Sequence, residues 1–383
     1  MSQLQGERDA RMKDFLARSG WGDAVVTPLP GDASSRRYAR LSDGARKAML
    51  MDQPQGAEAP IAPPGASPEQ RASLGYNAVA RLAGADCARF AAAAAWLRGQ
   101  GLAAPQIHAA DHAQGFVILE DLGDDLFANV LASGGDERAL YRAAVEVLAA
   151  IHLHDAPLHL PPPSPSGARR AGEADLRFPL FEYDAVALIA ETDLLTEWFL
   201  PLALGRTATK AEVSEHRRLW AAALAGTGAS RRVFVHRDYH AQNLLWLPER
   251  DGVARVGLID FQDAVAGSAA YDLISLTEDA RRDVSPTLAA DATAHYLAAM
   301  RAQGTPLDEA AFHKEMAVMA AQRNAKIVGI FARLYKRDGK ARYLSLLPRV
   351  WGYLERDLQH PALGDLSAWY DRVIPADKRA VTL

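Results

Sequence analysis

The sequence has little cysteine, no long apolar run and no excess of either charge. Its 383 residues contain one cysteine, Cys87, so neither an internal disulfide nor a cysteine metal cluster can stabilise the fold. The longest apolar stretch, near residues 90–97, is far shorter than the roughly 20 residues of a membrane span. Lys and Arg number 43 against 47 Asp and Glu, so no overall field attracts the chain to nucleic acid or to an acidic membrane. The polar, charged N-terminus is unlike a signal peptide, and we expect a cytoplasmic globular protein.

Secondary-structure signals divide the chain into an early part rich in strands and a later helical part. β-like runs flank Ser42-Asp43-Gly44, which is a tight-turn sequence. Apolar spacing predicts a helix from Asp86 to Arg98, with Asp86 as its N-cap. Helical patterns follow, apart from a Pro-rich excursion at about 155–175 and a strand-rich block over 233–263. This order favours an α+β fold with a small sheet lobe and a larger, mainly helical lobe.

The densest group of polar residues lies in the strand-rich block. Two β-like runs, 244–247 and 253–259, are joined by Pro-Glu-Arg-Asp-Gly, so residues equally far from that turn should lie side by side. Asn243 and Asp260 should therefore meet, and they offer the oxygen ligands that Mg²⁺ prefers. Asp238, five residues before Asn243, could accept a proton from a substrate hydroxyl beside that ion.

These residues also carry a family resemblance. His236-Arg237-Asp238 followed by Asn243, with Asp260-Phe261 further on, resembles the catalytic core of the protein-kinase superfamily. Gly267 and Asp272 make the sequence more similar to the aminoglycoside phosphotransferase-like small-molecule kinases. The resemblance implies a bilobal protein-kinase-like fold, with a nucleotide-binding lobe over residues 1–122 and a catalytic and acceptor-binding lobe over residues 123–383.

The same resemblance implies roles for single positions. Asp238 would be the catalytic base, and Asn243 and Asp260 would be the magnesium ligands. His236 and Asp272 would support the catalytic loop. The run from Gly31 is similar to a loop that covers the ATP phosphates, and residues 119–122 are similar to a hinge that binds adenine. The nucleotide-binding residues predicted in these two segments are Ser34, Ser35, Arg36, Arg37, Glu120 and Leu122.

A narrower resemblance comes from residues 31–38, 120–127, 259–264 and 322–344. These runs are similar to the anomeric amino-sugar kinases of bacterial cell-wall recycling. The resemblance implies that the chain uses ATP and Mg²⁺ to phosphorylate the anomeric hydroxyl of N-acetylmuramate, N-acetylglucosamine or both. It also implies a pathway link to a sugar-1-phosphate uridylyltransferase that would use the product.

One position departs from the kinase pattern. The strand after the phosphate loop should carry a lysine for the ATP phosphates, but Met51 occupies about that place and Lys47 lies nearer the turn. Two adjacent arginines, Arg36 and Arg37, lie where the phosphates should be. We hypothesise that one of them supplies the missing positive charge.

Acceptor residues are predicted less directly. N-acetylmuramate bears a carboxylate, which favours a cation in the acceptor site. Arg323 and Lys326 are the candidates from a cationic helical pattern that continues to Arg333, Lys336 and Arg337, although a solvated basic face is the alternative. Glu191 and Trp198 lie in the helical insertion where this family builds acceptor sites, and they either bind sugar or simply pack. His240 either approaches the substrate or caps the loop.

Two other functions stay open at this point. One is phosphorylation of a different small molecule, such as an aminoglycoside, choline or a similar alcohol, which the acceptor that raises ADP production would reveal. The other is a nucleotide-binding pseudokinase, because the usual lysine is missing. A pseudokinase would bind ATP without turnover on any acceptor.

Overall fold

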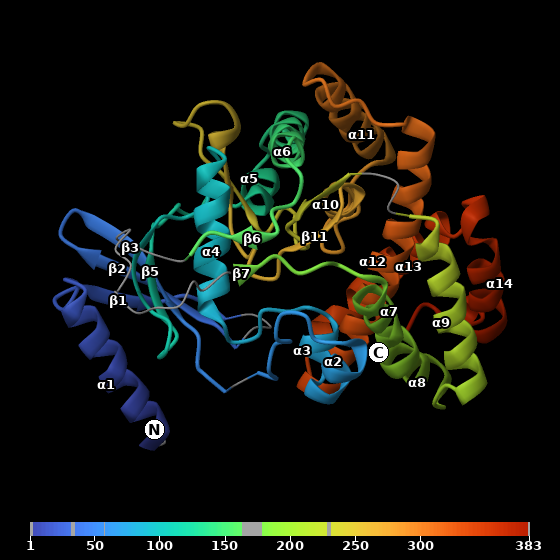
Figure 1. The fold of residues 1–383 in the computed structure, drawn as a ribbon, viewed down its shortest axis with the longest axis horizontal. Helices are drawn as coiled ribbons and strands as arrows, with labels where there is room; N and C mark the ends of the chain where they lie inside the picture. The colour runs from blue at the N-terminus through green and yellow to red at the C-terminus, as the bar shows by residue number, and fades with distance from the viewer. Residues whose placement is uncertain (1–2, 32–34, 57, 163–177, 228–230, 382–383) are drawn as a thin grey trace.

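The computed structural model describes residues 3–31, 35–56, 58–162, 178–227 and 231–381. A small N-terminal sheet lies beside a larger, mainly helical body (Figure 1), so the α+β architecture predicted from the sequence is confirmed. Ser34 and the stretch 163–177 of the predicted Pro-rich excursion fall outside the described residues. None of the helices in the described ranges combines the length and apolar character that crossing a bilayer requires.

The N-terminal sheet has five antiparallel strands in the order β1-β2-β3-β5-β4. Its strands are β1 (Val25–Pro28), β2 (Arg37–Asp43), β3 (Arg46–Asp52), β4 (Ile107–Asp111) and β5 (Phe116–Leu119). Asp43 pairs with Arg46 across the β2–β3 turn, and Gly44 adopts a φ of 58° there, which glycine tolerates at no steric cost. The predicted hairpin is therefore present.

The two faces of this sheet pack against different parts of the protein. One face lies under α1 (Gln3–Arg18), and the residues of this cluster are Phe15, Leu16, Trp21, Ala39, Leu41, Ala48, Leu50, Phe116 and Ile118. The opposite face carries Met51, Val117 and Leu119, which join the main core together with α4 (Cys87–Gly99). Successive strand residues point to opposite faces, so Met51 lies on the side that faces the rest of the molecule. Asp86 caps α4 by accepting a hydrogen bond from the Ala88 N–H at 3.0 Å, as predicted.

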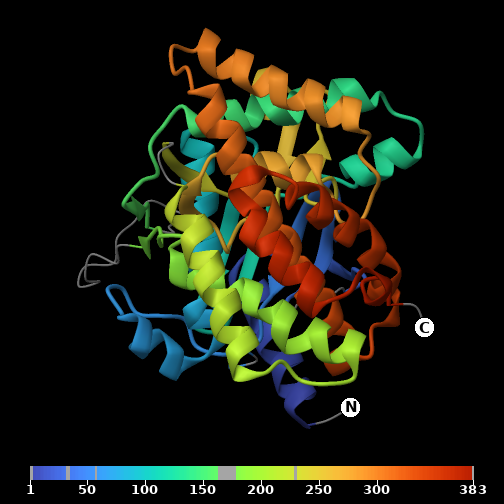
Figure 2. The ribbon, with the colours of Figure 1, turned by 90° about the vertical axis from the view of Figure 1, so that its right-hand side faces the viewer.

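The helical body is built around the long helix α12 (Glu309–Asp338). This helix contacts α7 (Ala185–Leu194), the π-helical turn η1 (Leu195–Phe199), α10 (Ala270–Thr277) and α13 (Leu347–Asp357). The C-terminal helices form the face of the molecule away from the N-terminal sheet (Figures 1 and 2). The other α-helices are α2 (Pro68–Leu74), α3 (Tyr76–Val79), α5 (Phe127–Ala132), α6 (Glu137–His152), α8 (Leu200–Leu204), α9 (Lys210–Ala225), α11 (Pro286–Ala302) and α14 (Gly364–Val373). A short two-stranded sheet is formed by β6 (His159–Leu160) and β7 (Phe178–Pro179).

The segment between β3 and α4 crosses from the N-terminal sheet to the helical body. It contains α2 and α3, and α3 packs against α7 (Figure 1). The Arg71 guanidinium anchors the segment by a bidentate ion pair with Asp184, with Nη1–Oδ2 and Nη2–Oδ1 distances of 2.5 and 3.0 Å. Residues that precede α4 in the sequence are therefore held against the helix that carries Glu191.

The close packing of α12 against α7 predicts opposite effects for two glycine-to-alanine changes. A Cβ on Gly329 would lie 2.5 Å from the backbone nitrogen of Leu195, whereas a Cβ on Gly352 in α13 would meet nothing within 4 Å. We expect Gly329→Ala to lower the free energy of unfolding by about 1–3 kcal/mol or more, because the backbones must separate. Gly352→Ala should raise it by up to about 1 kcal/mol, because alanine loses less conformational entropy in a helix. Urea denaturation of both variants measures the change in the free energy of unfolding. Changes of equal size and sign in the two variants would contradict this packing.

Candidate active site

The site is built on four short strands that hold a loop over residues 236–243. β8 (Arg232–Val235) pairs with β11 (Val265–Ser268), and β9 (Leu244–Trp246) pairs with β10 (Val256–Leu258). Leu244 is opposite Leu258, so Asn243, directly before Leu244, and Asp260, two residues after Leu258, lie at the open end of the hairpin. The Asn243 Nδ2 lies 3.5 Å from the Asp260 Oδ2 and donates to the Asp238 carbonyl oxygen at 2.9 Å. The structure therefore brings Asp238, Asn243 and Asp260 together.

The Asp238 carboxylate is half-buried and ionised. Burial alone would raise its pKa, but nearby positive charges, chiefly that of Lys326, outweigh burial and lower the pKa to about 2. In the part of the chain that the structure describes, no side chain donates a hydrogen bond to this carboxylate. Its oxygens are thus free to accept a proton from a bound hydroxyl group.

Asp272 supports the loop that carries Asp238. Its buried carboxylate accepts hydrogen bonds from the backbone N–H groups of His236 and Arg237, at 2.6 and 2.9 Å. Burial raises the pKa of Asp272 to about 7, although the two N–H donors oppose the rise. The His236 ring packs edge-on against Tyr239 and Phe261, and burial lowers its pKa.

Backbone conformation is unusual at two positions of the site. Arg237 has a φ of 75° and Asp260 a φ of 66°. Residues other than glycine rarely adopt this left-handed region, and such outliers are concentrated at functional sites. The loop is held in this form by its hydrogen bonds to Asp272 and by the Ser275 hydroxyl, which donates to the Arg237 carbonyl at 3.3 Å.

Asn243 and Asp260 fit a hard divalent cation. The Asn243 amide group donates to Asp238 and Asp260, so its Oδ1 remains as an acceptor for an ion. Among the described residues, no three His, Cys, Asp or Glu side chains form a metal cluster. A cation here would take few protein ligands and complete its shell with phosphate or water oxygens, as Mg²⁺ usually does.

Arg36 reaches this pair from the N-terminal lobe. Its Nη2 lies 3.0 Å from the Asp260 Oδ1, and its side chain is only 13% exposed. Its Nη1 donates to Gln262, and Gln262 donates to the same Asp260 oxygen at 3.2 Å. The guanidinium of Arg36 therefore lies against the carboxylate predicted to bind the metal.

The neighbours of Arg36 point elsewhere. Arg37 is half-exposed, and its Nε lies 3.7 Å from the Asp52 Oδ2. The Ser35 hydroxyl donates to Glu58 at 2.6 Å and accepts from Gln53 at 2.9 Å. Met51 is buried, and the Tyr38 hydroxyl donates to its sulfur at 3.5 Å.

The predicted hinge follows β5 directly. The Glu120 N–H donates to the Gln106 carbonyl at 2.8 Å, and the Glu120 carboxylate accepts from Arg250 at 2.7 Å. Leu122 is almost fully buried. Arg40 of β2 spans from the sheet to this segment, with an Nε–Oδ2 distance of 2.7 Å to Asp121.

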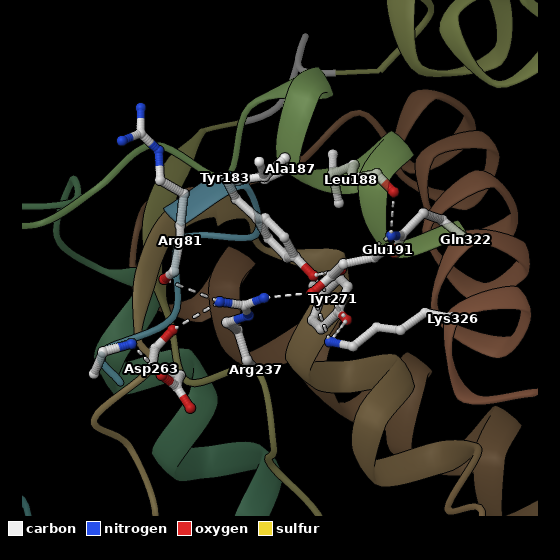
Figure 3. A network of polar contacts seen from close by, with 12 residues as sticks. Arg81, Tyr183, Ala187, Leu188, Glu191, Arg237, Asp263, Tyr271, Gln322 and Lys326 are labelled. Atoms are coloured by element: carbon white, nitrogen blue, oxygen red, sulfur yellow. Dashed lines mark hydrogen bonds and ion pairs between the residues drawn. The ribbon is translucent and has the colours of Figure 1, made fainter. Parts of the chain in front are cut away.

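A buried ionic network lies beside the catalytic loop (Figure 3). The Glu191 carboxylate pairs with Arg237, and its Oε1 lies 3.1 Å from the Lys326 ammonium. The Glu191 and Arg237 side chains are each 1% exposed. Tyr183 and Gln322 also donate to this carboxylate. Because four donors surround it, Glu191 holds residues from α7, α12 and the loop in one cluster.

The other predicted acceptor residues are spread over the helical body. Arg323 is buried and donates to the Glu278 carbonyl at 3.1 Å. Lys326 donates to the Tyr271 hydroxyl at 3.2 Å in addition to its ion pair with Glu191. Trp198 lies in η1 and is half-buried against the main core. His240 is buried with its Nε2 3.3 Å from an Arg281 nitrogen, and burial, together with that positive charge, lowers its pKa to about 4.

Arg237 and Tyr183 were missed as site residues by the sequence analysis. Arg237 could have been noticed because it directly precedes Asp238 in the motif. No local pattern, however, links it to Glu191 in α7, since that pairing exists only after the helix packs beside the loop.

Comparison with known proteins gives a family match over most of the chain. The sequence matches the phosphotransferase enzyme family over residues 25–309. It is 46% identical to an N-acetylmuramate/N-acetylglucosamine kinase of Caulobacter vibrioides, covering 98% of this chain and 99% of that protein. It is 30% identical to a Pseudomonas aeruginosa protein of the same name, covering 95% and 94% of the two chains.

Solved structures share the fold at low sequence identity. A microcompartment-associated aminopropanol kinase superposes with a TM-score of 0.57 at 15% identity, covering 95% of this chain and 99% of that chain. A choline/ethanolamine kinase family protein of Mesorhizobium loti gives a TM-score of 0.52 at 15% identity, covering 96% and 99%. The predicted protein-kinase-like fold is thereby confirmed. The family match spans residues 25–309, and the 46% identity to the Caulobacter vibrioides kinase extends over 98% of this chain. The chain therefore belongs to the phosphotransferase enzyme family.

Proposed function

We propose that this protein transfers the γ-phosphate of ATP to the anomeric hydroxyl of N-acetylmuramate, N-acetylglucosamine or both. The observation that carries the proposal is the ionised Asp238 carboxylate beside the Asn243–Asp260 pair. Relatives that this chain matches over nearly their whole length bear the name of kinases for these two sugars. The site geometry therefore supports phosphate transfer, and the names of the relatives support amino sugars as the acceptor class.

The reaction would proceed with each residue in a defined role. Asn243 and Asp260 would hold Mg²⁺, which neutralises the phosphate charge and orients the γ-phosphate. Asp238 would accept the proton of the anomeric hydroxyl while that oxygen attacks the γ-phosphorus and ADP leaves. Asp272 would keep the loop, and therefore Asp238, at the right distance. The anomeric hydroxyl is more acidic than an ordinary alcohol, so a carboxylate with a low pKa suffices.

ATP would lie between the N-terminal sheet and the helical body, at the junction of two lobes, 1–122 and 123–383. The Glu120 N–H is already used by Gln106, which leaves the Glu120 carbonyl and the Leu122 N–H as the backbone groups for adenine. Of the described residues in the predicted phosphate loop, Arg36 would lie along the phosphates, because Ser35 and Arg37 are directed to Glu58 and Asp52. We assign Glu191 and Arg323 to positioning rather than to sugar contact, because both are buried and bonded within the protein.

The setting of the reaction follows from its chemistry. ATP and free amino sugars meet in the cytoplasm, which we propose as the location. The product, a sugar 1-phosphate, is the substrate class of nucleotidyltransferases, so a sugar-1-phosphate uridylyltransferase would consume it.

Phosphorus NMR tests the reaction and the acceptor together. Purified protein with Mg-ATP and N-acetylmuramate, or with N-acetylglucosamine, should give a phosphate signal coupled to the anomeric proton. Asp238→Asn should slow the reaction by about 10²–10⁴-fold, because it removes the proton acceptor, while Mg-ATP binding stays within a few-fold. Kanamycin and choline serve as comparison acceptors. Phosphate on either of these instead of the sugars would replace the proposed acceptor, and ATP binding without turnover on all four would favour a pseudokinase.

Arg36 is expected to stand in for the missing strand lysine. With Mg²⁺ held by Asn243 and Asp260, the Arg36 guanidinium, which now lies 3.0 Å from Asp260, would be available for the phosphates. We expect Arg36→Ala to weaken Mg-ATP binding by about 10–100-fold, since it loses a charged hydrogen-bond donor.

Arg37→Ala is the matched control for Arg36→Ala, because Arg37 is half-exposed and directed toward Asp52. Its Mg-ATP affinity should change less than threefold. Isothermal titration with Mg-ATP measures both variants. Equal losses in both, or no loss in Arg36→Ala, would show that Arg36 does not replace the lysine.

A further inference from the structure

The cationic side chains of α12 differ in the protein groups that they already contact. Arg323 donates to the Glu278 carbonyl in the interior. Lys326 is paired with Glu191 at 3.1 Å and bonded to Tyr271 at 3.2 Å. Both side chains are therefore already held by groups of the protein. Arg337 is exposed and forms an ion pair with Asp338 at 2.7 Å.

Arg333 stands apart from these residues. Its guanidinium carbon lies 5.1 Å from the centre of the Tyr76 ring, which holds the group in place by cation–π attraction. Its Nε is buried, and no described residue accepts a hydrogen bond from it. Among the described residues, no carboxylate lies within ion-pair distance of Arg333 either. The Arg333 charge contributes to lowering the pKa of Asp338, but the Asp338 carboxylate is already paired with Arg337.

The position of Arg333 connects it to the catalytic base. It follows Lys326 by two helical turns, so the two Cα atoms are about 10 Å apart on the same side of α12. Helical side chains lean toward the N-terminus of the helix, and Arg333 therefore extends toward Lys326. The positive charges of both residues lower the pKa of Tyr76, against the larger effect of burial. Lys326 in turn lowers the pKa of Asp238. Lys326 thus acts electrostatically on both Tyr76 and Asp238, and Tyr76 is in contact with Arg333.

Through Tyr76, a second helix contacts Arg333 of α12. Tyr76 begins α3, in the segment that crosses from the N-terminal sheet and packs against α7. The Tyr76 ring of α3 and the Arg333 guanidinium of α12 are therefore in contact. A buried N–H without an acceptor is costly, and a ligand carboxylate would remove that cost while pairing with the charge.

We propose that Arg333 binds the carboxylate of an anionic acceptor sugar, with Tyr76 bracing the guanidinium. The inference rests on the proposed function and adds a specificity residue to it. The carboxylate of N-acetylmuramate would reach Arg333 while its anomeric hydroxyl lies at Asp238. N-acetylglucosamine has no carboxylate and would not use this contact. Arg333 therefore sets the preference between the two sugars without taking part in the chemistry.

Steady-state kinetics with both sugars tests the proposal. Arg333→Met keeps most of the aliphatic chain and removes the charge. It should lower kcat/KM for N-acetylmuramate by about 10–100-fold, mainly through KM, and change kcat/KM for N-acetylglucosamine by less than threefold. Arg333→Lys should recover part of the loss. Arg337→Met, four residues further along the same helix, should change neither value.

Each result separates this inference from the function on which it rests. Retained activity on N-acetylglucosamine shows that the Arg333→Met protein is folded. An equal loss for both sugars, or no loss for either, would overturn the role of Arg333 and leave the proposed function intact. If the unmodified protein phosphorylates neither sugar, the proposed function fails and the Arg333 assignment falls with it.

Discussion

The pairing of one buried carboxylate with two cations is the interaction on which the site depends. Glu191 lies in α7, Lys326 in α12 and Arg237 in the catalytic loop, and the Glu191 and Arg237 side chains are each 1% exposed. Removing one member of a buried ion pair commonly costs about 3–5 kcal/mol, because the other charge is left uncompensated. The network therefore requires the two helices and the loop to pack together. It also fixes Lys326, whose charge keeps Asp238 ionised.

The same network connects the loop over residues 236–243 to the segment before α4 and to α12. The Arg237 Nη1 donates to the Arg81 and Asp263 carbonyls at 3.3 Å, so the loop is tied both to the crossing segment before α4 and to the strand-end residues after Asp260. Helix α12, which carries the proposed acceptor residue Arg333, meets this arrangement through Lys326. Displacement of Lys326 would therefore change the electrostatic environment of Asp238 as well as the ion pair with Glu191.

Much of the catalytic end could be predicted from local sequence. Hairpin symmetry predicted that Asn243 and Asp260 meet, and their side chains lie 3.5 Å apart. Helix capping by Asp86 and the β2–β3 turn likewise follow from short-range chemistry. The acceptor end could not be predicted in this way. The local sequence indicates only that Glu191 and Arg323 are polar residues on helices. Glu191 pairs with Arg237, 46 residues away, and Arg323 donates to the Glu278 carbonyl, 45 residues away. Similarly, the Tyr76 ring that contacts Arg333 but not Arg337 is supplied by a distant segment.

A double-mutant cycle on Glu191 and Lys326 tests most directly whether this network positions the base. Glu191→Gln, Lys326→Met and the double variant would be compared by kcat for sugar phosphorylation, with Asp193→Asn on the same helix as the control, since Asp193 pairs only with Arg217 in the described structure. The account predicts that each single change lowers kcat and that the double variant loses much less than the product of the two losses, because both act through one ion pair. Strictly multiplicative losses, or unchanged kcat in Glu191→Gln, would contradict it.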